Sequence, residues 1–193
     1  MPHVLKRDRQ QFDDWIREYH STLYRHALWM TSRSDVAEDC VQEAYYQAWK
    51  SRKSLKDEAK VFSWLLTILR RMVYREYEQR ANNVTCTVDD FSSFPELAVD
   101  DDQGKMLDLI KAMHKLSTGH RDILLLHGLH GLSYLEISEV LEIPIGTVMS
   151  RLSRARTALD NALNHTVPSA QPSQPSQQGQ VINLKTGLYN NER

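Results

Sequence analysis

The 193-residue sequence has few cysteines and no long hydrophobic run. Its two cysteines, Cys40 and Cys86, stand far apart and form no CxxC pair, so we expect structural thiols rather than redox or metal chemistry. Apolar runs such as residues 123–126 are far shorter than the about 20 residues of a membrane-spanning helix, and no apolar segment follows the charged N-terminus. These absences predict a soluble, cytoplasmic protein without membrane insertion.

The sequence also lacks the motifs of common enzymes. It contains no glycine-rich phosphate loop, no GxSxG nucleophile elbow and no HExxH zinc motif. His127 and His130 lie close in the sequence, with His114 and His120 nearby, but their spacing across glycines does not show the convergence that zinc requires. We therefore expect no catalysis, no cofactor and no bound metal.

The formal net charge of -1 conceals an uneven distribution of charged residues. Residues 81–102 hold six acidic side chains and no lysine or arginine. This segment also loses helical periodicity and is followed by Gly104. We interpret residues 81–104 as an acidic flexible linker, and the segments on either side are more basic than the average suggests.

Apolar residues recur at three- and four-residue spacing on both sides of this linker, which predicts an all-α protein of two small helical domains. The first domain is assigned to residues 1–80 and the second to residues 105–165. Gly119, Gly128, Gly131 and Pro144 divide the second domain into helices too short to be stable unless they pack together. The Ser/Gln/Pro-rich tail, residues 166–193, has too few apolar residues to bury and is predicted to be disordered.

The stretch LSYLEISEVLEIPIGTVMSRLSRAR, residues 132–156, has the pattern of a helix-turn-helix. Ser133 and Glu136 form a capping box that starts the first helix, and Pro144 ends it because the preceding residue is driven toward an extended conformation. The second helix is expected to begin between Pro144 and Thr147. Four apolar residues share one side of it and are expected to be buried: Val148, Leu152, Ala155 and Leu159.

The opposite side of the second helix carries small polar residues and arginines, with no acidic residue between Glu142 and Asp160. Small polar residues can approach base edges in the major groove, and arginines near the rims can bind phosphates. A plain three-helix bundle with a solvated basic face is the alternative that the pattern leaves open. The candidate residues for a DNA contact are Thr147, Ser150, Arg151, Ser153, Arg154 and Arg156.

This stretch resembles region 4 of bacterial sigma-70 factors of the extracytoplasmic-function (ECF) type, in which GLSYxEIAxxLxxPxGTVxSRLxRAR is a characteristic run. Residues 35–49, DVAEDCVQEAYYQAW, resemble the polymerase-binding helix in region 2 of the same family. The resemblance implies a transcription initiation factor that binds core RNA polymerase, through the beta-prime clamp helices and the beta flap, and directs it to promoter DNA. It also implies that the six candidates of the second helix contact the minus-35 element of the promoter, and that an anti-sigma factor is a partner.

The helix over residues 35–49 carries acidic and amide groups that suit a basic protein partner, while Val36, Cys40, Ala44 and Ala48 share its apolar face. The positions that match the family's polymerase-binding residues are Asp39, Gln42 and Glu43.

Residues 60–80, KVFSWLLTILRRMVYREYEQR, resemble the family's helix that reads and helps open the minus-10 element. Arginines interleaved with aromatic rings suit single-stranded DNA, because phosphates meet charge and unstacked bases meet a ring. The apolar side of this helix is predicted to consist of Trp64, Leu65, Ile68 and Met72. The candidate residues for minus-10 DNA are Trp64, Arg70, Arg71, Tyr74 and Arg75, with Tyr77 as a further ring.

Five positions depart from the family pattern. Val61 stands where an aromatic residue is usual, Arg71 where asparagine is usual and Arg75 where an acid is usual. In the C-terminal motif, Met149 stands where lysine is usual and Ser153 where histidine is frequent. Losing a lysine lowers the affinity for phosphate, so we expect a minus-35 contact that is weaker or differently specific. Two other functions stay open at this point: a stand-alone helix-turn-helix regulator, and a sigma-like adaptor that binds a protein partner.

Overall fold

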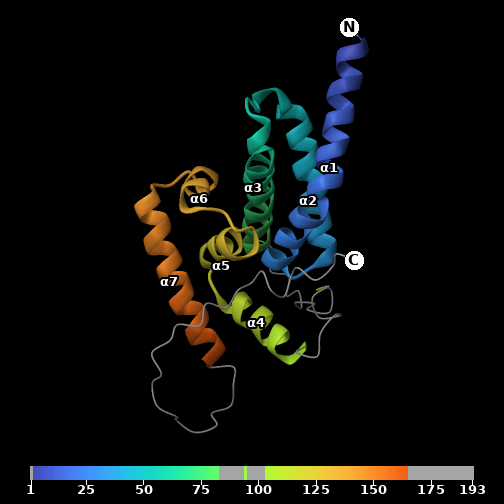
Figure 1. The fold of residues 1–193 in the computed structure, drawn as a ribbon. Coiled ribbons are helices and arrows are strands. Elements are labelled where there is room, and N and C mark those ends of the chain that lie inside the picture. The colour runs from blue at the N-terminus through green and yellow to red at the C-terminus, as the bar shows by residue number, and fades with distance from the viewer. Residues whose placement is uncertain (1, 83–93, 95–102, 165–193) are drawn as a thin grey trace, which may run out of the picture. The chain divides into compact units, whose positions relative to one another are not determined.

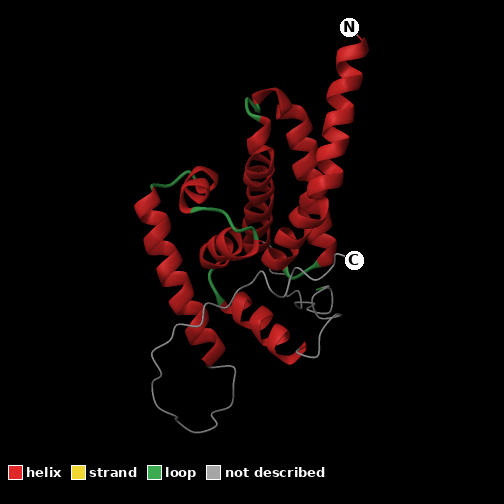
Figure 2. Cartoon of the chain, in the orientation of Figure 1, coloured by secondary structure: helices red, strands yellow, loops and turns green. Residues whose placement is uncertain are grey.

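The computed structural model describes residues 2–82, 94 and 103–164, and the structural statements below concern these residues. Every regular element in them is helical, which confirms the predicted all-α class (Figures 1 and 2). The chain divides into two compact units, residues 1–93 and 94–193. Most of the predicted acidic linker, and all of the predicted tail, lie outside the described residues. None of the described helices is both long and apolar enough to cross a membrane.

The first unit consists of three long helices that pack against one another: α1 (Pro2–Thr31), α2 (Ser34–Ser51) and α3 (Val61–Asn82). Two short 3-10 turns, η1 (Arg52–Ser54) and η2 (Glu58–Lys60), connect α2 to α3. The predicted apolar face of α2 is confirmed, because Val36, Cys40, Ala44 and Ala48 are all buried. Three of these side chains are small or carry a single sulfur, which allows the neighbouring helices to approach closely.

The predicted apolar side of α3 is only partly correct. Leu65 and Ile68 are buried, but Trp64 and Met72 are partly exposed. The fully buried row of α3 also includes Leu69 and Val73. The reason is that α3 packs against both α1 and α2, so its buried face is wider than one stripe and is centred elsewhere.

Polar and aromatic contacts fix the ends of these helices. Phe12 on α1 and Trp49 on α2 lie edge to face with ring centroids 5.2 Å apart. Arg52 covers the Trp49 ring at 4.0 Å and donates a hydrogen bond of 2.9 Å to the Trp49 carbonyl. The hydroxyl of Tyr77 donates to the Met30 carbonyl and so ties α3 to the end of α1. Tyr77, which we expected to offer a ring to DNA, thus has a structural contact in the first unit.

The second unit contains α4 (Gln103–Lys115), α5 (Thr118–Leu124), a π-helical segment (Leu125–Leu129), α6 (Tyr134–Leu141) and α7 (Ile145–Asn164). α7 packs against α4, α5 and α6 and is therefore the central helix of this unit. The predicted break at Gly119 is wrong, because the helix starts one residue earlier and Ser117 caps it. The break at Gly128 is also wrong, because this glycine lies within the π-helical segment.

A buried arginine closes the corner between α4 and α5. Arg121 is 6% exposed. Its Nε donates to the Met113 carbonyl at 3.0 Å, and its Nη2 donates to the His114 carbonyl at 2.8 Å and the Leu116 carbonyl at 3.4 Å. The last carbonyls of a helix have no partner within the helix, so one guanidinium satisfies several of them at once. This cap joins α4 to the helix that follows it.

The predicted helix-turn-helix is formed by α6 and α7. The capping box is confirmed: the Glu136 N–H donates to the Ser133 hydroxyl at 3.3 Å, and the Ser133 N–H donates to the Glu136 carboxylate at 2.8 Å. α6 ends at Glu142, whose φ of 55° is left-handed, and α7 begins directly after Pro144. The predicted apolar side of α7 is confirmed as well, since its four residues are buried: Val148, Leu152, Ala155 and Leu159.

His26 gives the first unit a pH-dependent stability. The imidazole lies on α1 and is fully buried. Burial and the positive charge of Arg70 lower the pKa of His26 from 6.5 to about 3. Below pH 6.5 the unfolded chain binds a proton at this position while the native chain does not, so the free energy of unfolding falls as the pH falls toward 3.

We therefore expect the wild-type protein to lose about 2 kcal/mol of unfolding free energy between pH 7.5 and pH 5 relative to a His26→Gln variant. Urea denaturation at the two pH values measures this difference. His20→Gln is the matched control, because His20 is on the same helix and exposed, and it should keep the wild-type slope. Equal slopes for the wild type and His26→Gln would contradict the assignment.

Candidate functional site

α7 brings the six candidate minus-35 residues together at the surface of one helix. Because the buried row faces the other helices, the remaining sides of α7 face solvent. Ser150, Ser153, Arg154 and Arg156 are exposed, and Thr147 and Arg151 are partly exposed. Their contact with DNA stays a prediction, but their accessibility from one direction is what such a contact requires.

The side chains on this surface lie along their own helix. The Ser150 hydroxyl donates to the Thr147 carbonyl at 3.1 Å, and the Thr157 hydroxyl donates to the Ser153 carbonyl at 3.2 Å. The Nε of Arg154 donates to the Ser150 carbonyl at 3.3 Å. Each hydroxyl oxygen keeps lone pairs that can accept another hydrogen bond, and an exposed arginine can extend at small cost. The exposed side of α7 is therefore cationic and accessible.

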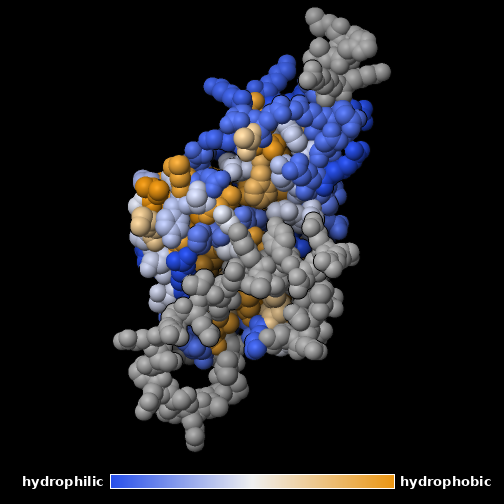
Figure 3. All heavy atoms as spheres, viewed as in Figure 1, coloured by the Kyte–Doolittle hydropathy of each residue, from blue (hydrophilic) through white to orange (hydrophobic). Residues whose placement is uncertain are grey.

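An apolar feature of this surface was missed in the sequence. Ile145 and Met149 on α7 are 47% and 55% exposed, and Leu135 on α6 is 61% exposed. Figure 3 shows hydrophobic residues at the surface over α6 and the start of α7. From the sequence, we noted Met149 only as a position at which the family pattern usually has lysine. The four-residue spacing to Ile145 was the signal that could have shown an apolar strip.

α3 carries the candidate minus-10 residues on the side away from its buried row. Arg70 lies over the Tyr74 ring at 5.6 Å, a cation–π contact that holds charge and ring side by side. Arg71 is exposed, and Trp64 and Tyr74 are partly exposed. These four side chains therefore share a surface with the mixed character that single-stranded DNA requires.

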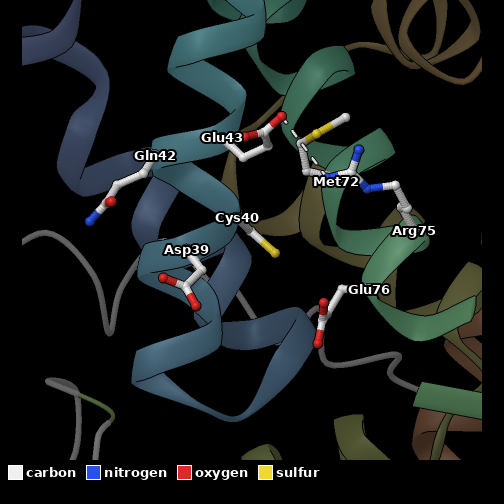
Figure 4. A pocket seen from close by; sticks show the side chains of 7 residues that line it. All are labelled: Asp39, Cys40, Gln42, Glu43, Met72, Arg75 and Glu76. Atoms are coloured by element: carbon white, nitrogen blue, oxygen red, sulfur yellow. Dashed lines mark ion pairs between the residues drawn. The ribbon is translucent and has the colours of Figure 1, made fainter. Parts of the chain in front are cut away.

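Arg75, the fifth candidate on α3, lies at the border of a second surface. A groove of about 480 Å³ between α2 and α3 is lined by Arg75, Met72 and Glu76 from α3 and by Asp39, Cys40, Gln42 and Glu43 from α2 (Figure 4). The Arg75 Nη2 lies 4.0 Å from a Glu43 carboxylate oxygen, which also accepts a hydrogen bond of 2.7 Å from the Gln47 amide. Arg75 is thus placed beside the candidate polymerase residues.

The three candidate polymerase residues point in different directions. Glu43 reaches across the groove toward α3, whereas the exposed Asp39 and Gln42 point away from Arg75 (Figure 4). One member of the set is therefore engaged within the protein, and the other two face solvent. Among the described residues, no group of three or more histidine, cysteine or acidic side chains is placed to hold a metal ion.

A three-helix unit with an acidic groove, followed by a helix-turn-helix unit with a cationic outer face, defines a helical protein built for protein and DNA contacts. Residues 15–83 match the family model of sigma-70 region 2, and residues 106–159 match that of sigma-70 region 4. The chain belongs to the sigma-70 family, to its extracytoplasmic-function type. It is a transcription initiation factor that directs core RNA polymerase to promoter DNA, and it is not an enzyme.

Named relatives support this assignment. The chain is 30% identical over 140 residues to the ECF RNA polymerase sigma factor EcfG of Rhodopseudomonas palustris, covering 71% of this chain and 76% of the relative. It is 25% identical to the ECF RNA polymerase sigma factor SigM of Mycobacterium tuberculosis, covering 82% of this chain and 80% of the relative.

Two solved structures have a similar fold. The sigma factor RpoE of Bartonella quintana, solved in complex with the anti-sigma factor NepR, has a TM-score of 0.69 and 28% identity, covering 80% of this chain and 98% of that chain. CnrH, solved with the cytosolic domain of CnrY, has a TM-score of 0.63 and 19% identity, covering 82% of this chain and 91% of that chain. The similarity to CnrH concerns the fold alone.

Cys40, which lines the groove between α2 and α3, has a buried free thiol. Burial, with the negative charges of Glu76 and Asp39 nearby, raises the pKa of its thiol from 9.0 to about 11. The thiolate is the reactive form, so at pH 8 the native thiol has about 100-fold less of it than an unburied one.

We expect iodoacetamide to modify Cys40 at least 100-fold more slowly in the native protein than in guanidinium, as estimated from the thiolate fraction alone. A Cys86→Ser background leaves Cys40 as the single thiol, and mass spectrometry follows the rate at pH 8. Similar rates in the native and unfolded states would show that the thiol is accessible and would contradict the buried position.

Proposed function

We propose that this sigma factor acts in the cytoplasm and divides its contacts between its two helical parts. Residues 1–80 bind core RNA polymerase and read and open the minus-10 element, and residues 105–165 read the minus-35 element. Residues 81–104 join them as the acidic linker, and residues 166–193 form a tail. The separate region 2 and region 4 matches and the two compact units support this division.

The polymerase contact is assigned to Asp39, Gln42 and Glu43, which meet the beta-prime clamp helices, while the second unit meets the beta flap. Two of these side chains are exposed on a rigid helix, and the third lies in the groove beside them. Carboxylate and amide groups at the surface of a fixed helix suit a basic partner. The core enzyme then joins two weak DNA readers, so that their affinities combine through effective concentration.

The minus-10 contact is assigned to Trp64, Arg70, Arg71 and Tyr74, with Arg75 at the margin. The Arg70–Tyr74 pair supplies a cation and a ring face within one contact. Unstacked bases can stack on such a ring while the guanidinium groups meet the phosphates. Arg75 also has Glu43 as a neighbour, so its share in DNA binding depends on releasing that carboxylate.

The minus-35 contact is carried by one observation: burial of one side of α7 leaves a cationic side exposed, with no acidic residue before Asp160. Thr147, Ser150 and Ser153 are small enough for the helix to approach base edges. Arg154 is placed among them and can reach a base, while Arg151 and Arg156 lie nearer the rims and can bind phosphates.

An anti-sigma factor is the proposed regulatory partner. The Bartonella quintana sigma factor was solved with such a partner, and this chain covers 98% of it at 28% identity. A protein that masks the cationic and acidic surfaces described above would block polymerase and DNA together.

Run-off transcription tests the proposed function. Purified protein, sigma-free core polymerase and a library of promoter fragments should give transcripts that are lost when the protein is omitted. The double variant Asp39→Asn, Glu43→Gln should reduce transcript yield and core affinity together, because it removes two negative charges that face the basic partner. Asp14→Asn, at an exposed acid elsewhere in the first unit, is the control.

The outcomes separate the alternatives. Stable association with core but no transcripts would point to a sigma-like adaptor. Specific DNA binding without any association with core would point to a stand-alone helix-turn-helix regulator. Either result would contradict the proposal for this chain.

Arg154→Ala should weaken promoter binding by holoenzyme by ~1–3 kcal/mol and relax the preference at one minus-35 base pair. Competition binding against fragments that vary at each minus-35 position measures both effects. Arg17→Ala, which removes an exposed arginine from α1, should leave the preference unchanged. A loss of the same size on every sequence would instead assign Arg154 to a phosphate.

A further inference from the structure

An apolar strip on α7 runs into its proposed DNA-reading face. Ile145 and Met149 are four residues apart and are 47% and 55% exposed. Four-residue spacing places side chains one above the other on a helix, so Ile145, Met149 and the exposed Ser153 form one ridge. Met149 therefore lies between an apolar neighbour and a residue assigned to minus-35 DNA.

The strip belongs to the cationic surface rather than to the core. The buried row of α7 points toward the other helices, and Met149 is not part of it. Ser153 and Arg156, four and seven positions after Met149, are exposed on the same side of α7. Met149 has no hydrogen-bond donor for a phosphate, and its flexible, polarizable side chain adapts to a small apolar group.

We propose that Met149, with Ile145 beside it, contacts the C5-methyl group of a thymine in the minus-35 element. This inference rests on the proposed function, because it requires α7 to enter the major groove. Thymine alone among the four bases presents a methyl group there, and apolar side chains read it. The position that holds lysine in the family pattern thus reads a base in this protein and not a phosphate.

The surroundings of Met149 favour DNA over a protein partner. A specific protein interface has a broad apolar centre, whereas the strip on α7 consists of Ile145 and Met149 and continues into the exposed polar residues Ser153 and Arg156, four and seven positions after Met149. Within α7 no acidic residue lies between Glu142 and Asp160, so the charged residues of the helix next to the strip are all positive. The shape and the charge of this surface both suit the major groove.

Thymine-to-deoxyuridine substitution tests the contact, because it removes only the methyl group. Holoenzyme containing the full chain is titrated with a promoter obtained by run-off selection, in which each minus-35 thymine on either strand is replaced in turn. We expect one replacement to weaken binding by wild-type holoenzyme about threefold to fivefold, the effect of one buried methyl group. Replacements at the other thymines should leave the Kd unchanged.

Variants then assign the effect to Met149. Met149→Ala should bind the thymine and deoxyuridine promoters equally, and selection with this variant should lose the preference for thymine at that position. Met149→Lys should also be insensitive to the methyl group, and its affinity should fall more steeply with salt because a phosphate contact is restored. Leu135→Ala removes an equally exposed leucine from α6 and should keep the wild-type sensitivity.

Two results would overturn the inference. If no deoxyuridine replacement changes the Kd of the wild type, α7 does not read a methyl group. If Met149→Ala keeps the same sensitivity, another side chain reads it, and a protein partner becomes the better occupant of the strip. Both results presuppose promoter-specific binding by wild-type holoenzyme; the absence of any such binding would instead contradict the proposed function.

Discussion

Burial of one side of α7 is the constraint on which the second unit depends. Val148, Leu152, Ala155 and Leu159 are fixed against α4, α5 and α6, so the helix cannot rotate without exposing its apolar row. The residues on the other side of α7 are exposed to solvent as a consequence of this packing. The arginines and serines need no further support, because a rigid helix already holds them in one register.

Local hydrogen bonds set where the two helices of this motif begin and end. The capping box at Ser133 starts α6, and the left-handed Glu142 turns the chain away from it before Pro144 admits α7. Arg121 likewise fixes the corner between α4 and α5, because its guanidinium donates hydrogen bonds to three backbone carbonyls. Short helices have little stability of their own, so these caps and the shared core together keep the unit folded.

The sequence predicts features that depend on local pattern and misses those that depend on tertiary packing. The capping box, the start of α7 and its buried row follow from residue type and helical period, and all three are confirmed. The buried face of α3 was misjudged because two neighbouring helices, rather than one, determine it. The burial of His26 follows the helical spacing, since it lies three residues after Leu23 and four before Met30, both buried. The π-helical segment and the burial of Arg121 had no sequence signal, since each arises from contacts between different helices or from local deformation of a helix.

The candidate sites also combine features that the sequence pattern predicts with features that only the tertiary structure shows. Residue type and period put the six minus-35 candidates on the accessible sides of α7, but only the structure shows that Glu43 and Arg75, 32 positions apart in the sequence, are neighbours. Their side chains are 36% and 55% exposed, and a pair at 4.0 Å in such surroundings contributes less than about 1 kcal/mol. A basic group from a partner can therefore replace Arg75 at Glu43 for little cost. The same exchange would release the guanidinium of Arg75 toward the surface that carries Arg71 and Tyr74, so one weak ion pair joins the surfaces that we propose for polymerase and for minus-10 DNA.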